Sequence, residues 1–241
     1  MKILIVVNGA YDWRPHFAAW DVHQVWVQRS EWSMSGGRLR VRDRRGVHEP
    51  DVILWRLGAI DPDPTHRAIL ELIRLSGLPC VNSASCLLRG YDRLSMLCEL
   101  REAGASVIDF DVAIGGAIDE LTESSPAVFK IGNLHGGQGK ARAMDDRSWR
   151  ELANLAGVAT DYVTVEPFID YVRDIRCMAV GERIWAMSRR GRSWRANVQT
   201  RATDLIEPPR EMATQTHAIM AHLGADVLGI DFLERADGSF V

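Results

Sequence analysis

The clearest capacity for chemistry lies in a glycine-rich loop between two lysines, Lys130 and Lys140. Four glycines fall within eight residues of this loop, at positions 132, 136, 137 and 139. Glycine lets backbone amides approach an anion closely, and lysine ammonium groups suit phosphates as point charges. The loop has neither the Walker A sequence nor the glycine fingerprint of dinucleotide-binding folds. A simple hairpin tip is the alternative, and the two lysines favour a lid over nucleotide phosphates.

A second candidate is an apolar strand interrupted by Pro167, within the segment Glu166–Ile169. Proline cannot donate a hydrogen bond to a sheet ladder, so backbone groups beside it are open to an adenine edge. An ordinary edge strand with a proline is the competing interpretation. Asp174, shortly after this strand, is either a ribose contact or a turn carboxylate that pairs with Arg176.

Two further features complete the candidate chemistry. Four arginines fall within seven residues between Arg189 and Arg195. Such runs are usually solvated faces, but beside phosphates they stabilise the charge that develops during phosphoryl transfer. Asp231 is the one carboxylate in the apolar stretch 228–233. Because buried aspartates are rare unless paired or metal-bound, a magnesium ligand competes here with a structural salt bridge.

Composition limits the classes of protein that remain. The 241 residues (27.0 kDa) suffice for one large or two modest domains. Lysine plus arginine total 29 against 32 for aspartate plus glutamate, so bulk attraction to nucleic acid or to an anionic membrane is not expected. No apolar run approaches the ~20 residues that span a bilayer. The four cysteines form no CxxC pair, which favours reduced thiols in a cytoplasmic protein.

Apolar periodicity predicts the elements that position these residues. Continuous apolar runs predict buried parallel strands, and spacings of three and four predict helices. In the first part we expect strands at 3–7, 51–57 and 78–82, a hairpin-like stretch at 35–46, and helices at 64–76 and 92–103. In the second part we expect strands at 127–131, 140–144, 164–169, 176–180, 184–188 and 228–233, and helices at 146–156 and 211–224.

Taken in order along the chain, these features resemble the ATP-grasp superfamily, most closely synapsin and the ribosomal-protein glutamyl ligase (RimK-like) branch. The resemblance covers nearly the whole chain. It is carried by Asp51–Arg56 and Gly77–Ser83, by the loop from Val128 to Lys140, by Glu166–Asp170 with Asp174–Arg176, and by Trp194–Asn197. The implied fold is an α/β ATP-grasp fold of α+β subdomains. Its expected parts are an N-terminal α/β domain (1–89), a central subdomain with the glycine-rich lid (90–165) and a C-terminal subdomain (166–241).

The resemblance also implies roles for single residues. The implied nucleotide-binding residues are Arg93, Lys130, Gly136, Gly137, Gln138, Gly139, Glu166, Pro167, Phe168, Ile169 and Asp174. Among them, Lys130 is expected on the α- and β-phosphates and the backbone of 166–169 on adenine. The implied catalytic residues are Arg176, Arg195 and Asn197, with the last two near the γ-phosphate or the acyl phosphate. Asp231 is implied as the first magnesium carboxylate.

Two departures from the family pattern stand out. Arg93 occupies a position where many relatives have a phosphate-binding lysine, so a planar fork replaces a point charge. Relatives also continue past the strand of Asp231 into one that carries a glutamate and an asparagine of the metal site. Only 10 residues follow Asp231, the last of them Val241. The expectation is therefore either an incomplete chain, with its C-terminal core strand missing, or a partial metal site.

The family implies an ATP-dependent carboxylate–amine ligase that forms an amide or peptide bond through an acyl phosphate, with ATP and Mg²⁺ as cofactors. The expected partners are ATP and a small-molecule, amino-acid or peptide substrate, and a homodimer is possible. The alternative is a synapsin-like protein that binds ATP without turnover. An unrelated α/β domain is the third interpretation. The carboxylate and amine substrates are not predicted.

Overall fold

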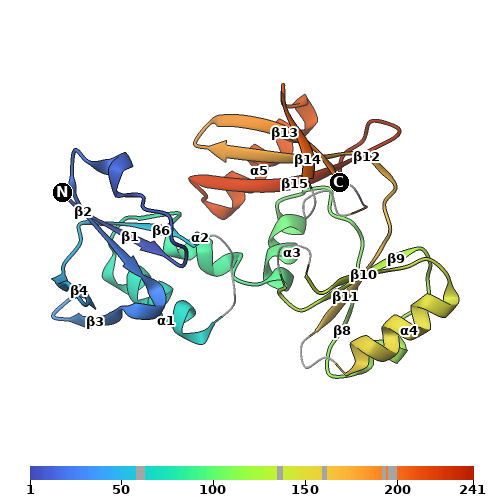
Figure 1. Cartoon of the computed structure of the whole chain (residues 1–241), viewed down its shortest axis with the longest axis horizontal. Helices are drawn as coiled ribbons and strands as arrows, with labels where there is room; N and C mark the ends of the chain where they lie inside the picture. The colour runs from blue at the N-terminus through green and yellow to red at the C-terminus, as the bar shows by residue number, and fades with distance from the viewer. Residues whose placement is uncertain (58–62, 135–137, 159–161, 192–193, 195–199) are drawn as a thin grey trace. The chain divides into compact units, whose positions relative to one another are not determined.

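The computed structural model describes the chain except for residues 58–62, 135–137, 159–161, 192–193 and 195–199. The chain divides into two compact units (Figure 1). The first comprises Met1–Glu99 and Met220–Val227, and the second comprises Leu100–Ile219 and Leu228–Val241. Among the described residues, no helix is both long and apolar enough to cross a lipid bilayer.

The first unit is built on a parallel sheet in the order β2-β1-β6-β7. Its strands are β1 (Lys2–Val7), β2 (Asp21–Trp26), β6 (Val52–Arg56) and β7 (Cys80–Val81). The apolar run of β1 is buried on both faces, because Leu4 and Val6 enter one core cluster and Ile5 and Val7 enter another. Coverage on both faces is what a continuous apolar strand requires, and the parallel strand predicted there is confirmed.

Helix α1 (Pro64–Ser76) crosses between β6 and β7, as the sequence predicts. The Asp63 carboxylate caps its first turn by accepting hydrogen bonds from the Thr65 and His66 amides. Gly77 ends the helix with a φ of 68°, a conformation that favours glycine. The helices α2 (Ala84–Arg89) and α3 (Arg93–Glu102) follow β7.

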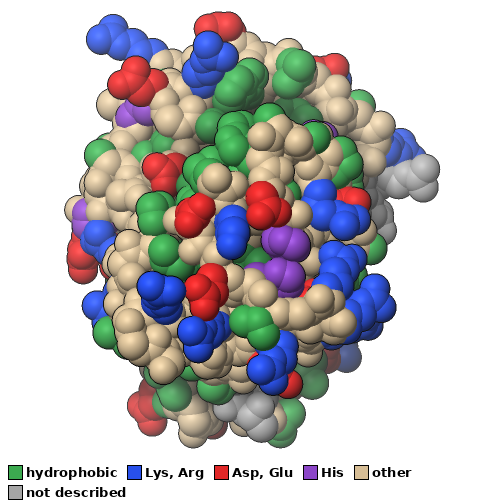
Figure 2. All heavy atoms as spheres, turned by 90° about the vertical axis from the view of Figure 1, so that its left-hand side faces the viewer, with side chains coloured by type: hydrophobic (Ala, Val, Ile, Leu, Met, Phe, Trp, Pro, Cys, Tyr) green, Lys and Arg blue, Asp and Glu red, His purple; other side chains and the backbone are tan. Residues whose placement is uncertain are grey.

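A small antiparallel sheet lies between β2 and β6 in the sequence. It contains β3 (Glu31–Ser35), β4 (Arg38–Asp43) and β5 (Gly46–His48). Two short 3₁₀ turns precede it in the sequence: Arg14–Phe17 lies before β2, and Val27–Arg29 lies between β2 and β3. On β4, Leu39 and Val41 are buried while the alternating arginines point outward. Basic and acidic side chains occur side by side over this face of the molecule (Figure 2), in line with the small net charge.

The first unit is completed by a late segment of the chain. The Asn82 side chain accepts hydrogen bonds from the Asp226 and Val227 amides at 2.8 and 2.7 Å, and it donates one to the Val227 carbonyl at 2.7 Å. All three hydrogen bonds join the Asn82 side-chain amide to backbone atoms that lie 144 or 145 residues later in the sequence. Asn82 therefore fastens the end of β7 to the segment that follows α5.

The second unit contains two sheets. The first has the order β10-β9-β11-β8, formed by β8 (Asp111–Ala113), β9 (Ala127–Ile131), β10 (Lys140–Ala143) and β11 (Val163–Pro167). One face packs on α4 (Asp146–Gly157) and the short turn Ala117–Glu120. Phe129 and Val165 from the sheet and Trp149 from α4 form that core. A capping box between Asp145 and Ser148 starts the helix.

The second sheet has the order β14-β13-β12-β15. Its strands are β12 (Tyr171–Val180), β13 (Arg183–Gly191), β14 (Thr200–Ile206) and β15 (Val227–Arg235), and α5 (Arg210–Leu223) lies in the sequence before β15. Ile175, Cys177, Ala186 and Phe232 pack with Met212 of α5 on one face of this sheet. The opposite face is therefore the one that presents polar side chains.

Candidate functional site

In the second unit, the sheet β10-β9-β11-β8, here called the first sheet, carries cationic side chains on the face that points away from its core. In the strand register, Lys130 of β9 lies opposite both Lys140 of β10 and Thr164 of β11. Because side chains alternate along a strand, these three residues share the face opposite to Phe129 and Val165. Arg142, two residues after Lys140, lies on the same face. The sequence thus places both loop-flanking lysines on one surface.

Lys130 and Glu166 form an ion pair on this face. The Lys130 side chain is 18% exposed and that of Glu166 is 13% exposed, so the pair is largely removed from solvent. Beside it, the Thr164 hydroxyl is buried without a hydrogen-bond partner among the described residues. A phosphate that approaches the Lys130 ammonium must therefore compete with the Glu166 carboxylate.

The predicted lid leaves β9 and returns to β10 through a tight set of backbone contacts. The Ile131 amide donates to the Gly139 carbonyl, and the Gly132 amide donates to the Tyr162 carbonyl, both at 2.8 Å. The Tyr162 hydroxyl donates to Asn133 Oδ1 at 2.8 Å. Both ends of the loop are therefore fixed to β10 and to the start of β11.

Gly139 carries the strictest backbone requirement of this loop. Its φ is +61°, and a Cβ atom there would lie 2.4 Å from Leu134 Cδ1. Gln138 is the other predicted lid residue among those described. Gly136 and Gly137, which the sequence also assigned to phosphate binding, lie outside the described residues.

The strand predicted to read adenine is open along one edge. β8 pairs with β11 as far as Val165, which lies opposite Asp111. Beyond that point Glu166 and Pro167 pair only with β9, within the ladders that the described residues form. The Phe168 amide donates to the Pro126 carbonyl at 2.9 Å and is therefore occupied. The free edge at Glu166–Pro167 is the arrangement that the proline predicted.

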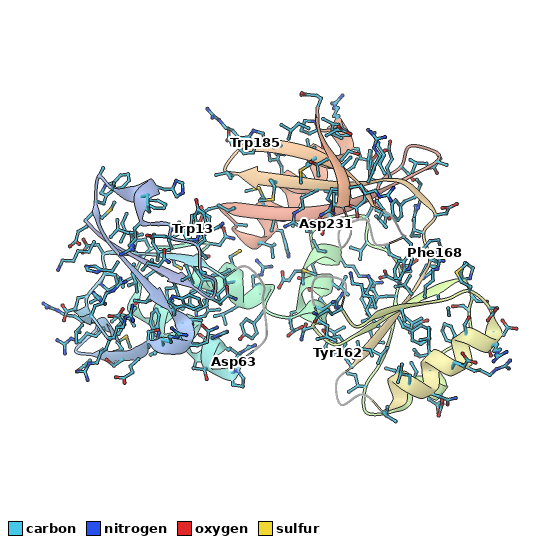
Figure 3. All side chains as sticks on the ribbon, in the orientation of Figure 1. Trp13, Asp63, Tyr162, Phe168, Trp185 and Asp231 are labelled. Atoms are coloured by element: carbon cyan, nitrogen blue, oxygen red, sulfur yellow. The ribbon has the colours of Figure 1, made fainter. Side chains whose placement is uncertain are left out.

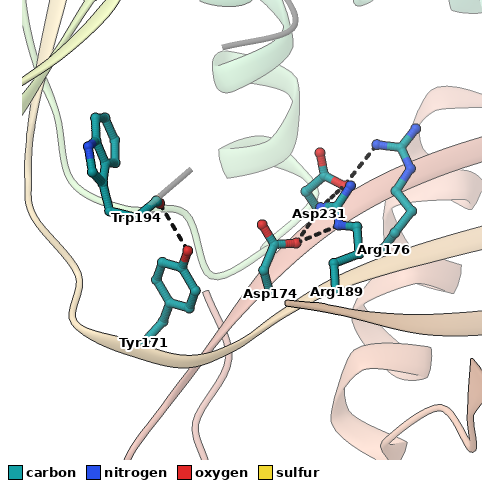
Figure 4. Close-up of polar contacts among 6 residues, drawn as sticks. All are labelled: Tyr171, Asp174, Arg176, Arg189, Trp194 and Asp231. Carbon is teal, nitrogen blue, oxygen red and sulfur yellow. Dashed lines mark hydrogen bonds and ion pairs between the residues drawn. The ribbon is translucent and has the colours of Figure 1, made fainter. Parts of the chain in front are cut away.

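Aromatic rings and one arginine connect this strand with the start of the arginine-rich segment. The Arg142 guanidinium lies 4.7 Å from the Phe168 ring centroid and 5.8 Å from that of Trp194. The two rings meet edge to face at 6.3 Å. The Tyr171 hydroxyl donates to the Trp194 carbonyl at 2.9 Å, which fixes the start of β12 to the same group (Figure 4).

The polar face of the second sheet holds a network of two carboxylates and two guanidinium groups (Figure 4). Arg189 of β13 donates through Nε to Asp174 Oδ1 at 2.8 Å and through Nη2 to Asp231 Oδ1 at 2.9 Å. Arg176 also reaches Asp231 Oδ1, at 2.9 Å. Asp231, on β15 (Figure 3), is thus shared by two arginines. The turn pairing of Asp174 with Arg176 is not found, because Arg176 pairs with Asp231 instead.

Burial shifts the pKa of one member of this network, Asp174. Loss of solvation raises the pKa of Asp174 above its ordinary value, while the bond to Arg189 acts in the opposite direction. The nearby Asp231 charge raises the Asp174 pKa further, and the Lys140 charge lowers it. Lys140 belongs to the first sheet and Asp174 to the second, so a charge on one sheet of this unit influences the pKa of a carboxyl group on the other.

Gly229 of β15 makes room for the Arg176 side chain. A Cβ atom at Gly229 would lie 2.4 Å from Arg176 Nη2 and 3.0 Å from Met178 Sδ. The guanidinium therefore lies directly over the backbone of β15, next to Asp231. A larger residue at this position would displace the guanidinium from the network.

The donor chemistry of the network suits a magnesium ion. Mg²⁺ prefers carboxylate oxygens, phosphate oxygens and water, and Asp174 and Asp231 supply carboxylates that share contacts with one guanidinium. The Asp231 side chain is 43% exposed, so its oxygens are accessible to a ligand. The carboxylates are thus donors of the kind that the ion prefers, and to reach Asp231 Oδ1 the ion would have to displace the guanidinium groups of Arg176 and Arg189.

The structure thus brings together two groups of predicted residues. Asp174, Arg176 and Asp231 meet on the second sheet, and Lys130 and Glu166 meet on the first. The predicted catalytic residues Arg195 and Asn197 lie outside the described residues. Arg93 is the first residue of α3 and belongs to the other unit, and its contact with nucleotide stays a prediction.

Sequence reasoning assigned no individual role to three cationic residues of the site. Lys140 was named as a flank of the glycine-rich loop and Arg189 as part of the arginine-rich segment, whereas Arg142 was not named. The signal for Arg189 was strand alternation, since it lies opposite Asp174 in the β12–β13 hairpin around Gly181. The signal for Lys140 and Arg142 was the same alternation on β10, which places both on the face of Lys130.

Comparison with known proteins gives matches of three kinds. A family model described as the synapsin ATP-binding domain matches residues 119–210. Synapsin from Drosophila melanogaster is 23% identical over 98% of this chain and 26% of its own length. A probable alpha-L-glutamate ligase from Pasteurella multocida (strain Pm70) is 26% identical over 80% of this chain and 66% of its own length. The chain thus spans about a quarter of the first relative and 66% of the second.

A solved structure shares the fold along the whole chain. It is the RiPP-associated ATP-grasp ligase of Chryseobacterium gregarium, in complex with ADP and with a leader and core peptide. The TM-score is 0.69 at 12% sequence identity, and the match covers 99% of this chain and 86% of that one. At this identity the similarity establishes a common fold.

Proposed function

This chain belongs to the ATP-grasp superfamily, and from that membership we propose that it is an ATP-dependent ligase that joins a carboxylate to an amine. The observation that carries the proposal is the pair of polar sheet faces in the second unit. Together they present five cationic side chains, those of Lys130, Lys140, Arg142, Arg176 and Arg189. Such a concentration of cations suits the negative charge of a nucleoside triphosphate.

The proposed reaction has two steps. A carboxylate oxygen of one substrate attacks the γ-phosphorus of ATP, the bond to the bridging oxygen breaks, and ADP leaves. The nitrogen of an amine then attacks the carbonyl carbon of the acyl phosphate. Inorganic phosphate leaves with the electron pair of the broken C–O bond, the nitrogen loses a proton, and an amide remains. The protein's main task in such transfers is to position the reactants and stabilise the developing charge.

We assign the residues on the first sheet to the nucleotide. Lys130 would bind the α- and β-phosphates, which requires its ammonium to exchange Glu166 for phosphate oxygens. The open backbone edge at Glu166–Pro167 would read adenine, and the loop that ends at Gly139 would cover the phosphates.

We assign the network on the second sheet to the reacting groups. Arg176 and Arg189 would neutralise the transferred phosphoryl group, and Asp174 would lie near the ribose. Asp231 would hold a magnesium ion, which screens phosphate charge when it is bound. Because Arg176 and Arg189 already share Asp231, these guanidinium groups are held in place before any substrate arrives.

A second candidate function is nucleotide binding without turnover. The match of residues 119–210 to the synapsin ATP-binding domain favours it, since that description names binding alone. The same face of Lys130, Lys140 and Arg142 would serve this function equally well. The two candidates differ in whether a carboxylate substrate accelerates ADP formation.

The deciding experiment measures both properties on the same protein. ATP binding is followed by calorimetry, and ADP release is followed with Mg²⁺ in the presence and absence of pooled amino acids and short peptides. A ligase gives ADP release that rises with a carboxylate substrate and falls at least about 100-fold in Arg176→Gln. Arg183→Gln, an exposed arginine on β13, serves as the matched control and should leave the rate unchanged.

Three outcomes separate the interpretations. Substrate-stimulated ADP release that depends on Arg176 supports the ligase. ATP binding without stimulation by any pool supports the nucleotide-binding alternative and contradicts the ligase. Absence of ATP binding contradicts both.

A further inference from the structure

The polar network on the second sheet borders an apolar area of the same sheet face. Side chains alternate along a strand, so Arg176 and Met178 of β12 point to one side, and a Cβ atom at Gly229 of β15 would meet both of them. In the strand register, Met187 of β13 lies opposite Arg176. Trp185 of the same strand lies opposite Met178. Charged and apolar side chains are therefore immediate neighbours on one surface.

A third strand extends this apolar area. Leu205 of β14 lies opposite Met187 in the register and is 81% exposed. Trp185 is 47% exposed and Met178 is 38% exposed (Figure 3 labels Trp185). We call Met178, Trp185, Met187 and Leu205 the apolar patch. Contiguous exposed apolar side chains, bordered by polar residues, are typical of surfaces that bind a ligand or a partner.

The network and the apolar patch follow one another along β12. Asp174 pairs with a guanidinium, and Arg176 carries one. Met178, the next residue on this side of the strand, lies opposite an indole ring. Because successive residues on one side of a strand are about 7 Å apart, the surface changes from charged to apolar over roughly the length of one amino acid.

The proposed reaction determines which end of a substrate faces each part of this surface. The reacting carboxylate must come within bonding distance of the γ-phosphorus, and Arg176 and Arg189 are assigned to the transferred phosphoryl group. The group attached to that carboxylate then lies close to these guanidinium groups, beside the apolar patch. A polar group that is buried on the patch would lose water without gaining a hydrogen-bonding side chain, whereas an apolar group would gain contacts.

We propose that the apolar patch selects the carboxylate substrate, as an acid with a large apolar group close to the reacting carboxylate. The side chains of leucine and phenylalanine are groups of this kind. The carboxylate lies at Arg176 and the apolar group on Met178, Trp185 and Leu205, which determine specificity and take no part in the chemistry. The inference rests on the proposed ligase function, because it takes the network to hold the reacting groups.

The first test follows binding by NMR, on the full chain labelled with ¹³C-methyl methionine. The signals of Met178 and Met187 are assigned with Met178→Leu and Met187→Leu. The probes are N-acetylphenylalanine, N-acetylglycine and N-acetylaspartate, whose amines are blocked. They are titrated without nucleotide and again with Mg²⁺ and a non-hydrolysable ATP analogue.

N-acetylphenylalanine is expected to shift both methionine signals through its ring current. It should bind at least about tenfold more tightly than the other two probes, because burial of one large apolar side chain contributes at least that ratio. Unchanged methionine signals under both conditions would overturn the proposal. Equal affinities of the three probes, or tighter binding of N-acetylaspartate, would overturn it as well.

Variants locate the binding site of the apolar group. Trp185→Ala and Leu205→Ala are expected to reduce the preference for N-acetylphenylalanine over N-acetylglycine several-fold and to leave the affinity for ATP unchanged. Leu155→Ala is the matched control, since Leu155 is a 61% exposed leucine on α4 of the same unit. An unchanged preference in both patch variants, with native circular dichroism, would contradict the assignment.

Turnover separates failure of this inference from failure of the proposed function. ADP release is measured with Mg²⁺, ATP, each acid and hydroxylamine, whose nitrogen displaces phosphate from an acyl phosphate and leaves a hydroxamate. A higher kcat/KM for N-acetylphenylalanine supports both proposals. Faster turnover of N-acetylaspartate supports the ligase and overturns selection by the apolar patch. No ADP release with any acid, while N-acetylphenylalanine still shifts the Met178 signal, contradicts the ligase and supports the binding site.

A second copy of this chain is the alternative occupant of the apolar patch. Light scattering measures the oligomeric state of the natural protein and of Trp185→Ala. A dimer that Trp185→Ala converts to a monomer would assign the patch to an interface between copies and overturn the proposal. The same state in both proteins supports a patch that is open to substrate.

Discussion

Asp174 and Arg189 face each other across the antiparallel strands β12 and β13, and Arg189 Nε donates to Asp174 Oδ1 at 2.8 Å. Their side chains are only 10% and 11% exposed. The same guanidinium reaches Asp231, so one arginine neutralises a buried carboxylate and holds a more exposed one in place. A buried charge that loses its partner is costly, and this gives the pair a measurable role in stability.

Replacement of Arg189 should therefore destabilise the protein strongly. Arg189→Gln leaves the Asp174 carboxylate buried without its partner and should lower the free energy of unfolding by about 3 kcal/mol. Urea denaturation measures the change, and the double variant Asp174→Asn/Arg189→Gln should recover part of it. The adjacent Arg190→Gln is the control, since Arg190 is exposed and its pair with Asp204 contributes at most about 1 kcal/mol. Equal effects of the two single variants would refute the prediction.

The raised pKa of Asp174 predicts a pH dependence with a definite sign. Because burial raises the pKa in the folded state, the folded protein binds more protons than the unfolded one between the two pKa values. The stability of the natural protein, relative to Asp174→Asn, should therefore fall as pH rises from about 3.9, the ordinary aspartate pKa, through the raised value, and level off above it. Denaturation of both proteins from low to neutral pH provides the measurement, and a difference that rises with pH would contradict it.

Lys130→Ala should weaken nucleotide binding. Loss of a charge-assisted contact to phosphate costs on the order of 1.5–3 kcal/mol, which calorimetry with ATP measures directly. The variant also leaves Glu166 without its cation, so stability changes as well. The double variant Lys130→Ala/Glu166→Gln separates the two effects, because it restores stability but not affinity. Lys2→Ala is the control, because Lys2 is the only lysine of the sequence besides Lys130 and Lys140.

Gly139→Ala tests the geometry of the predicted lid. The added methyl meets Leu134 Cδ1 and also forces a left-handed backbone on alanine, which costs about 1 kcal/mol by itself. Gly238→Ala carries the same backbone cost with open space around it, since no atom lies within 4 Å of a Cβ there. Gly139→Ala should therefore lower stability and ATP affinity more than Gly238→Ala, and Leu134→Ala should relieve the excess. Equal losses in both glycine variants would show that the Leu134 contact is irrelevant.

Apolar periodicity predicted the elements that bury an apolar face, and missed those that do not. The helix at 64–76 and the strand at 3–7 are confirmed, because Ile69, Ile73 and Ile5 are fully enclosed. The strand β14 was missed, since nearly all of its residues are exposed and give no apolar pattern. The short β2 and β8 and the helix α2 were missed as well, because each is brief or polar on its open side.

For the site, short motifs in order along the chain predicted the ATP-grasp fold and family. A solved ATP-grasp ligase shares the fold, and residues 119–210 match the synapsin ATP-binding domain. Asp174, Arg176 and Asp231 each lie within such a motif and share one ion-pair network, and their roles stay predictions. Arg189 was named only as part of the arginine-rich segment, because its pairing with Asp174, 15 residues earlier, is revealed only by strand register. The roles of Arg195 and Asn197 stay predictions.

The hydrogen bonds of Asn82 have a consequence for biosynthesis. Its partners, Asp226 and Val227, leave the ribosome long after Asn82 does, with the whole of Leu100–Ile219 in between. While the chain is being made, the first unit therefore lacks the segment that satisfies this side chain. Its final closure therefore waits until Leu100–Ile219, the larger part of the second unit, has been made.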